Sequence, residues 1–298
     1  MSRTGPLALI ISASMGGGHD GAAAELKRRL VDSGWTVDVR DFLDAIPARL
    51  GLALRSGYRT QLNYAPSSYD RLYRLLDHNG KAFRAVRQST SIADARLRSW
   101  AAGADIAISV YPLASQCLGR MRAAGRIGIP VITYLTDLSV HPIWVSPGVD
   151  LHAALHEVTA EQVRAIAPSA NVELCAPLVR PEFGPDPLRR AALRAAYGVP
   201  AGEQVALVVA GAWGVGAVER TVEKLIATPG VHPMVVCARN ERLLAGLSGR
   251  RDVTAIAWSD DMPGLLATAD LVVQNAGGLT SLEAFATGVP VLSVGCLP

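Results

Sequence analysis

A histidine follows three consecutive glycines near the start of the chain. Gly16–His19 comes after the apolar segment Leu7–Ser12 and just before a helical pattern over Gly21–Ser33. The positive end of a helix dipole disfavours an imidazolium, so we expect His19 to stay neutral and able to accept a proton. The pattern therefore favours His19 as a general base that deprotonates a hydroxyl. A capping histidine at a tight turn is the structural alternative.

The same glycines allow a second interpretation. Gly16–Gly21 fits the GxGxxG spacing of dinucleotide-binding loops, and Asp41 follows about 20 residues later, where such proteins bind ribose. An NAD-dependent oxidoreductase is thus the alternative from another class. In the general-base interpretation, Gly17 and Gly18 let an acceptor molecule approach the backbone closely.

A second polar group follows a later strand pattern. Val131–Leu135 is apolar, and Asp137, His141 and Trp144 come after it. Because ligands of open α/β sheets bind at the carboxyl ends of the strands, we expect this loop beside His19. Asp137 would then orient His19 or stabilise its charged form, and His141 and Trp144 would contact the acceptor. An aspartate that caps the next turn and a surface histidine are the alternatives.

A third group lies near the end of the sequence. The apolar segment Leu271–Val273 leads into two glycines and then into a helical pattern. Backbone N–H groups at such a helix start bind phosphate. A glutamate one turn inside the helix can accept hydrogen bonds from two ribose hydroxyls. These features predict a sugar-nucleotide pocket, with Gly277, Gly278, Thr280 and Glu283 as its residues.

Another glycine-rich turn follows the strand pattern Gln204–Ala210. Its glycines, Gly211 and Gly214, would let a diphosphate or an acceptor lie against the backbone. Tight packing of a strand on a helix is the alternative. His152 and His156 are four residues apart, but no third ligand follows from their spacing, so we predict no metal site.

The composition is that of a soluble α/β protein. Half of the 298 residues are apolar, and the formal net charge of +3 is too small to indicate nucleic acid. The sequence has no apolar run of the ~20 residues that cross a bilayer. The four cysteines form no CxxC pair and indicate reduced thiols. We therefore expect a cytoplasmic protein and predict no protein partner.

Positive charge is concentrated in one segment. Residues 49–87 hold eight Arg or Lys residues against two acids. This helical, aromatic-containing segment is either a solvated face or a surface that binds anionic lipid head groups.

Strand and helix patterns alternate along the chain, which predicts parallel sheets. We expect an N-terminal Rossmann-like domain over residues 1–180, with a helical insertion at 48–102. Four prolines between Pro177 and Pro187 predict a linker over 181–197. A second Rossmann-like domain follows at 198–298.

Four ordered motifs resemble those of one enzyme group. They are the run ending at His19, Thr136-Asp137 with His141 and Trp144, Ala176–Phe183, and Asn275–Ala284. Together they resemble the monogalactosyldiacylglycerol synthase and processive diacylglycerol glucosyltransferase group of glycosyltransferase family 28. The resemblance covers nearly the whole chain.

This resemblance implies a GT-B fold, with two Rossmann-like domains facing a cleft. It implies an inverting, metal-independent and cofactor-free transfer of a hexose from a UDP-sugar to a lipid, most simply diacylglycerol. A polyprenyl-linked or small-molecule acceptor is the alternative. The resemblance further implies that uracil binds at Trp258 and Met262. It also implies that residues 49–87 contact the membrane, and that the protein is peripheral on the inner face of the cell membrane.

Two departures from the group accompany the resemblance. Ala212-Trp213 stands where relatives usually have Gly-Glu, which affects the donor or acceptor contacts of that loop. The sequence also ends at Pro298, before the sugar-reading loop and last helix of relatives, so we expect a truncated C-terminal domain.

Overall fold

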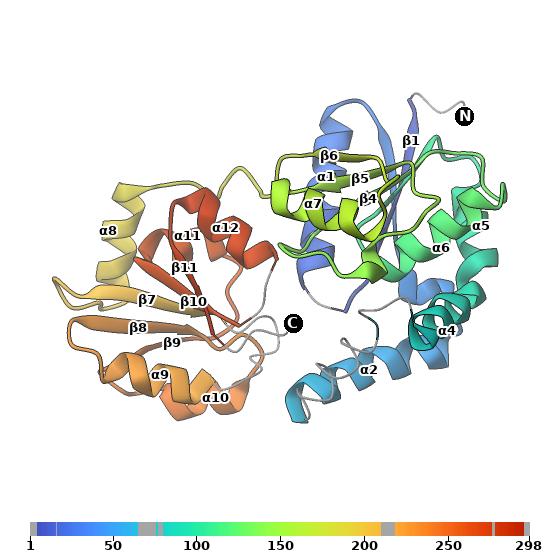
Figure 1. The fold of residues 1–298 in the computed structure, drawn as a ribbon. Helices are drawn as coiled ribbons and strands as arrows, with labels where there is room; N and C mark the ends of the chain where they lie inside the picture. The colour runs from blue at the N-terminus through green and yellow to red at the C-terminus, as the bar shows by residue number, and fades with distance from the viewer. Residues whose placement is uncertain are drawn as a thin grey trace. The chain divides into compact units, whose positions relative to one another are not determined.

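The computed structural model describes residues 5–15, 17–64, 76, 80–209, 218–275 and 278–294. The chain divides into two compact units (Figure 1). The N-terminal unit comprises Met1–Gln61 and Ser67–Leu178, and the C-terminal unit comprises Leu62–Pro66 and Val179–Pro298. Each unit is an α/β layer structure around one parallel sheet.

The sheet of the N-terminal unit has six parallel strands in the order β2-β1-β3-β4-β5-β6. The strands are β1 Leu7–Ser12, β2 Thr36–Asp41, β3 Ile106–Ser109, β4 Val131–Tyr134, β5 Leu151–Ala154 and β6 Val172–Leu174. β1 pairs with β2 on one side and with β3 on the other. The strand order therefore reverses between β1 and β3, and such a switch point is where open α/β sheets bind ligands.

Helices cover both faces of this sheet and fill the insertion. They are α1 Gly17–Asp32, α2 Ala48–Tyr64, α4 Lys81–Ser89, α5 Asp94–Ala101, α6 Pro112–Ala123 and α7 Glu157–Ile166. Short 3-10 helices are η1 Phe42–Ala45, η2 Thr90–Ala93 and η3 Pro142–Trp144. The helical character predicted for 48–102 is confirmed for the part of that segment that the structure describes.

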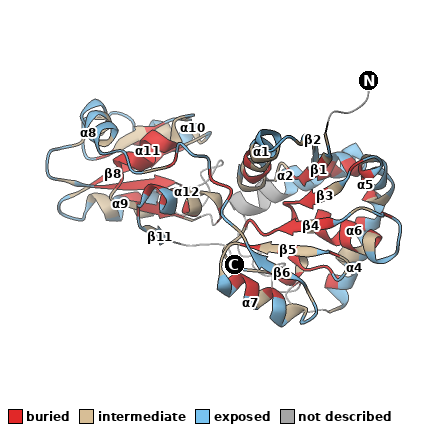
Figure 2. Cartoon of the chain, turned by 90° about the horizontal axis from the view of Figure 1, so that it is seen from above, coloured by how far each residue is buried: buried red, intermediate tan, exposed pale blue. Residues whose placement is uncertain are grey.

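The central strands form the core of the unit. Four residues of β1 in a row, Ala8 to Ile11, have no exposed surface, and Figure 2 shows β1, β3 and β4 as buried. A strand covered by helices on both faces reads as a continuous apolar run, which is why β1 was recognisable from sequence. The edge strand β6 is largely exposed.

The C-terminal unit repeats this architecture with five parallel strands in the order β11-β10-β7-β8-β9. The strands are β7 Gln204–Val209, β8 Val231–Val236, β9 Thr254–Ile256, β10 Leu271–Gln274 and β11 Val291–Ser293. The described helices are α8 Pro187–Ala196, α9 Val218–Ile226, α10 Glu241–Leu247, α11 Met262–Thr268 and α12 Leu279–Thr287.

Two segments differ from the sequence prediction. α1 begins at Gly17 rather than Gly21, because the first N–H groups of a helix need no intrahelical partner and glycine is tolerated there. The predicted linker 181–197 contains α8, whose first residue, Pro187, occupies a position that favours proline. Arg190 and Arg194 of α8 both pair with Asp270, which fixes the helix on the C-terminal unit.

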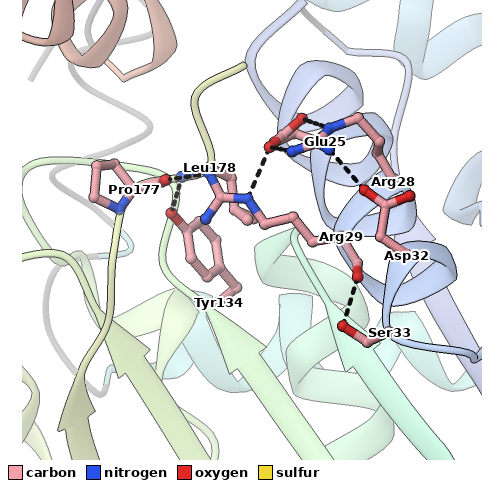
Figure 3. A network of polar contacts seen from close by, with 8 residues as sticks. All are labelled: Glu25, Arg28, Arg29, Asp32, Ser33, Tyr134, Pro177 and Leu178. Atoms are coloured by element: carbon pink, nitrogen blue, oxygen red, sulfur yellow. Dashed lines mark hydrogen bonds and ion pairs between the residues drawn. The ribbon is translucent and has the colours of Figure 1, made fainter. Parts of the chain in front are cut away.

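A polar network joins α1 to the last residues of the N-terminal unit (Figure 3). The buried Glu25 carboxylate pairs with Arg28 and Arg29, and these guanidiniums lower the pKa of Glu25. Arg29 also donates to the Pro177 carbonyl at 3.0 Å. The Leu178 N–H donates to the Tyr134 hydroxyl at 2.9 Å. The end of the unit is thus held by groups from α1 and β4.

α6 and the loop before β5 approach each other backbone to backbone. A Cβ added at Gly148 would lie 1.8 Å from the carbonyl oxygen of Gly119, far inside van der Waals contact. A Cβ at Gly119 would lie 2.3 Å from Ser146 Oγ. Only glycine fits at these positions without a shift of the backbone.

We predict that Gly148→Ala destabilises the protein by about 1–3 kcal/mol or more, because the methyl group forces α6 away from the loop. Urea unfolding measures the change. Gly128→Ala is the matched control, since a Cβ there meets no atom within 4 Å. Equal stability of the two variants would contradict the close approach.

Candidate active site

His19 lies at the switch point of the N-terminal sheet. It is the third residue of α1, which begins just after β1. A Cβ added at Gly17 or Gly18 would meet no atom within 4 Å, so open space borders the backbone of the first turn. The glycines thus leave this helix start accessible, as the sequence interpretation requires.

Two aromatic rings border His19. The Tyr111 ring meets the imidazole edge-on with 5.3 Å between centroids, and the Trp144 ring lies at 5.9 Å. Tyr111 follows β3 as the N-cap residue of α6, and Trp144 ends η3. Three segments distant in sequence therefore meet at this edge of the sheet.

Asp137 reaches His19 indirectly. Trp144 Nε1 donates to Asp137 Oδ2 at 2.9 Å. The atom within hydrogen-bond distance of His19 Nδ1 is Thr136 Oγ1, at 3.3 Å. Asp137 still contributes charge to the site, because its carboxylate acts to raise the pKa of His19.

His19 favours its neutral form. Burial lowers the pKa of His19, and this effect outweighs the opposing influence of Asp137, a Val110 backbone hydrogen bond and Asp20. The sequence argument predicted correctly that the pKa of His19 is lowered, but it attributed the shift to the helix dipole. The main cause is desolvation of the imidazole. A neutral imidazole can accept a proton at neutral pH.

The two other predicted acceptor residues are buried. His141 is 4% exposed, and its Nδ1 accepts a hydrogen bond from the Ile143 N–H at 3.1 Å. It therefore caps η3 and is not the surface histidine considered as an alternative. Trp144 is 2% exposed and contacts His19 and Asp137. Contact of either residue with an acceptor stays a prediction.

The dinucleotide interpretation finds no support in the surroundings of Asp41. The carboxylate of Asp41 accepts hydrogen bonds from the backbone N–H groups of Ser14 and Leu43 and pairs with Arg55. It therefore has a structural role in joining β2 to the loop after β1 and to α2.

The predicted donor residues that the structure describes lie at the carboxyl edge of the C-terminal sheet. Gly278 adopts a positive φ of 63° immediately before α12, a conformation that favours glycine. Thr280 and Glu283 belong to the first two turns of α12. Burial raises the pKa of Glu283 to about 7, against the opposing charge of Arg180. Glu283 thus titrates near neutrality.

An exposed tryptophan lies at the end of β9 in the same unit. Trp258 is 51% exposed, its Nε1 donates to Asp260 Oδ1 at 2.9 Å, and the Arg239 guanidinium lies 5.0 Å from its ring centroid. Met262 opens α11, which is capped by Asp261. Because β8 and β9 are parallel to β10, their ends share one edge of the sheet with Gly278.

Three predicted donor residues, Gly211, Gly214 and Gly277, lie outside the described residues. Over the residues that are described, no cluster of three or more His, Cys, Asp or Glu side chains has the arrangement of a metal site. Sequence reasoning gave no role to Tyr111, Thr136 or Arg180. The rule that selected Asp137 could also have selected Tyr111, since Tyr111 comes two residues after the end of the parallel strand β3.

Comparisons with known proteins agree with this architecture. A processive diacylglycerol beta-glucosyltransferase of Bacillus pumilus is 29% identical over 63% of this chain and 50% of that protein. A probable chloroplastic monogalactosyldiacylglycerol synthase of Glycine max is 26% identical over 95% of this chain and 57% of that protein. The chain thus spans about half the length of these curated relatives.

Solved structures share the fold. Sucrose-phosphate synthase from Thermosynechococcus elongatus has a TM-score of 0.62 at 14% identity, covering 97% of this chain and 81% of that one. Anabaena HepE in complex with UDP-glucose has a TM-score of 0.58 at 14% identity, with the same coverage. At this identity the likeness shows the fold alone, which is the GT-B fold that the sequence predicted.

The family model described as monogalactosyldiacylglycerol (MGDG) synthase matches residues 19–175. This match begins at His19, extends through Tyr111, Asp137 and Trp144, and covers more than half of the 298 residues. The chain belongs to the MGDG synthase family.

Proposed function

We propose that this protein transfers a hexose from a UDP-sugar to the hydroxyl of a lipid, with diacylglycerol as the acceptor. The observation that carries the proposal is His19, whose imidazole contacts two aromatic rings at the switch point of the sheet and whose lowered pKa favours the neutral form. Family membership supplies the substrate class, because relatives are named for glucosyl transfer to diacylglycerol and for monogalactosyldiacylglycerol synthesis.

The proposed reaction is a single displacement without a metal. A ring nitrogen of His19 takes the hydroxyl proton of the acceptor as the acceptor oxygen bonds to the anomeric carbon of the sugar. The bond from that carbon to the β-phosphate oxygen breaks, UDP leaves with the electron pair, and the configuration inverts. The N–H groups at the start of α12 would stabilise the leaving diphosphate, and Glu283 would bind the ribose.

The direct test incubates the full-length protein with diacylglycerol liposomes and UDP-glucose, UDP-galactose or UDP-N-acetylglucosamine. Mass spectrometry then identifies the lipid product. A hexosyl-diacylglycerol establishes the reaction and its donor. UDP binding without a lipid product would reject diacylglycerol and favour a polyprenyl-linked or small-molecule acceptor.

We predict that His19→Ala lowers kcat by roughly 10²–10⁴-fold, the usual contribution of a general base. The affinity for UDP, measured by calorimetry, should change little, because His19 belongs to the N-terminal unit and the predicted nucleotide residues belong to the C-terminal unit. Transfer at the wild-type rate would exclude His19 as the base.

For Glu283 we predict a pH-dependent role. With a pKa of about 7, the carboxylate that accepts ribose hydroxyls forms only as the pH rises through neutrality, so UDP should bind more tightly at pH 8 than at pH 6. Glu283→Gln should remove this dependence and weaken binding at pH 8 by about 1–3 kcal/mol. UDP itself also titrates in this pH range. Subtracting the binding free energy of the variant from that of the wild type at each pH removes this contribution, because it is the same for both proteins.

The same shift has a consequence for stability. A pKa raised above the usual glutamate value of 4.5 means that the folded state holds the proton more tightly than the unfolded state, so the free energy of unfolding falls as the pH rises from about 4.5 to 7. The free energy of unfolding of Glu283→Gln should not show this fall, because glutamine has no proton to lose. A variant that unfolds more easily than the wild type at pH 8 without ligand would contradict the burial of the charge.

We further propose that the insertion binds the anionic inner face of the cell membrane. No helix in the part of the chain that the structure describes combines the length and apolarity needed to span a bilayer. On α2, however, Leu50, Leu52 and Leu54 are 42%, 65% and 40% exposed. Lys81 and Arg84 are exposed on α4. Exposed leucines together with basic side chains favour an interfacial contact.

Reversing two of these charges tests the contact. Lys81→Glu with Arg84→Glu should weaken binding to vesicles containing an anionic lipid by tenfold or more, since each basic residue near such a surface contributes about 1 kcal/mol. Co-sedimentation measures the loss. Lys224→Glu with Arg242→Glu changes the net charge equally on α9 and α10 and is the matched control. Equal losses in both variants would reject a specific surface.

A further inference from the structure

Thr136 lies between the imidazole of His19 and the carboxylate of Asp137. Its Oγ1 is 3.3 Å from His19 Nδ1 and 3.5 Å from Asp137 Oδ1. The residue is 6% exposed, so water has little access to its side chain. Trp144 Nε1 donates to the other oxygen of Asp137 at 2.9 Å. A chain of polar contacts thus runs from the indole through the carboxylate and the hydroxyl to the ring nitrogen.

The chemistry of these groups gives the chain a direction. A carboxylate accepts hydrogen bonds only, a hydroxyl has one proton to donate, and Nδ1 of a neutral imidazole can either donate or accept. If the Thr136 hydroxyl donates to Asp137, its oxygen accepts a hydrogen bond from Nδ1–H, and Nε2 keeps a free lone pair. If the hydroxyl donates to Nδ1 instead, the ring proton sits on Nε2, which then cannot act as a base.

We propose that Thr136 is a positioning residue that selects the tautomer of His19 with its proton on Nδ1, so that Nε2 is the atom that deprotonates the acceptor. The inference rests on the proposed role of His19 as general base. The negative charge of Asp137 favours this arrangement, because a charge-assisted hydrogen bond is stronger than one to neutral Nδ1.

Other groups also lie near the imidazole of His19. The Asp20 carboxylate accepts a hydrogen bond from the Ser12 hydroxyl at 2.7 Å, and the Tyr111 ring meets the imidazole by an edge-to-face contact. The backbone hydrogen bond at Val110 favours the charged form of the ring, as the carboxylates do. Thr136 is the side chain whose contacts join His19 to Asp137.

The step conserves protons. The O–H bond of the acceptor breaks and an Nε2–H bond forms, which makes His19 an imidazolium. The proton on Nδ1 stays in place, and Thr136 keeps donating to Asp137. The carboxylate then stabilises the imidazolium through an oriented hydroxyl, without itself receiving a proton.

Nitrogen-15 NMR of the histidine rings tests the tautomer without any substrate. The wild-type protein should show His19 with Nδ1 protonated and Nε2 bare. Thr136→Val, which has nearly the same shape but no hydroxyl, should shift a measurable fraction to the Nε2–H tautomer. Thr136→Ser keeps the hydroxyl and should restore the wild-type pattern. A wild-type tautomer in Thr136→Val would overturn the inference.

Kinetics supply a second readout. Thr136→Val should lower kcat by roughly 10–100-fold, the loss expected for a hydrogen bond to a charged group, with KM for the UDP-sugar unchanged. The acidic limb of its kcat/KM profile should move to lower pH, because the imidazolium loses a hydrogen-bond partner. Thr136→Ser should recover most of the rate. An unchanged urea-unfolding midpoint serves as the control for folding.

The experiments distinguish a failure of the general-base role of His19 from a failure of the positioning role of Thr136. If His19→Ala is as active as the wild type, His19 is not the general base, and the proposed reaction is wrong in the role it gives to His19. If His19→Ala is inactive while Thr136→Val keeps the wild-type rate, pH profile and tautomer, the base stands and only the role of Thr136 is rejected.

Discussion

The parallel pairing of every strand is the constraint on which the rest of this structure depends. Backbone hydrogen bonds hold β1 between β2 and β3 in fixed register, and all carboxyl ends therefore open at one edge of the sheet. The residues that follow β1, β3 and β4 meet there, although they are distant in sequence. His19, Tyr111 and Thr136 owe their proximity to this ladder, and side-chain contacts then refine their geometry.

Burial disfavours the charged form of one titratable group in each unit. It lowers the pKa of His19 and raises that of Glu283, because a low-dielectric surrounding disfavours either charge. The imidazole of His19 is thereby kept able to accept a proton, while the carboxylate of Glu283 is only partly ionised near neutrality. Each group has a counter-charge that limits the shift, Asp137 for the histidine and Arg180 for the glutamate.

Sequence patterns predicted the fold well because buried parallel strands are continuous apolar runs, and because a polar loop after such a strand marks a ligand edge. They located His19 and Asp137 for that reason. They missed the bridging position of Thr136, since a distance of 3.3 Å to a ring nitrogen depends on tertiary packing. They also placed a linker where α8 forms, because the arginine pairs to Asp270 that stabilise this helix join residues about 80 positions apart.

The network around Glu25 attaches the last residues of the N-terminal unit to α1 and β4. Arg29 and Tyr134 hold Pro177 and Leu178 on the N-terminal unit, beside the helix that carries His19. Val179, the first residue after this anchor, is buried in the core of the C-terminal unit, and the next residue is Arg180, the counter-charge of Glu283. Only two residues of chain therefore separate the backbone anchored beside the His19 helix, at Leu178, from the charge that opposes the pKa shift of the Glu283 carboxylate.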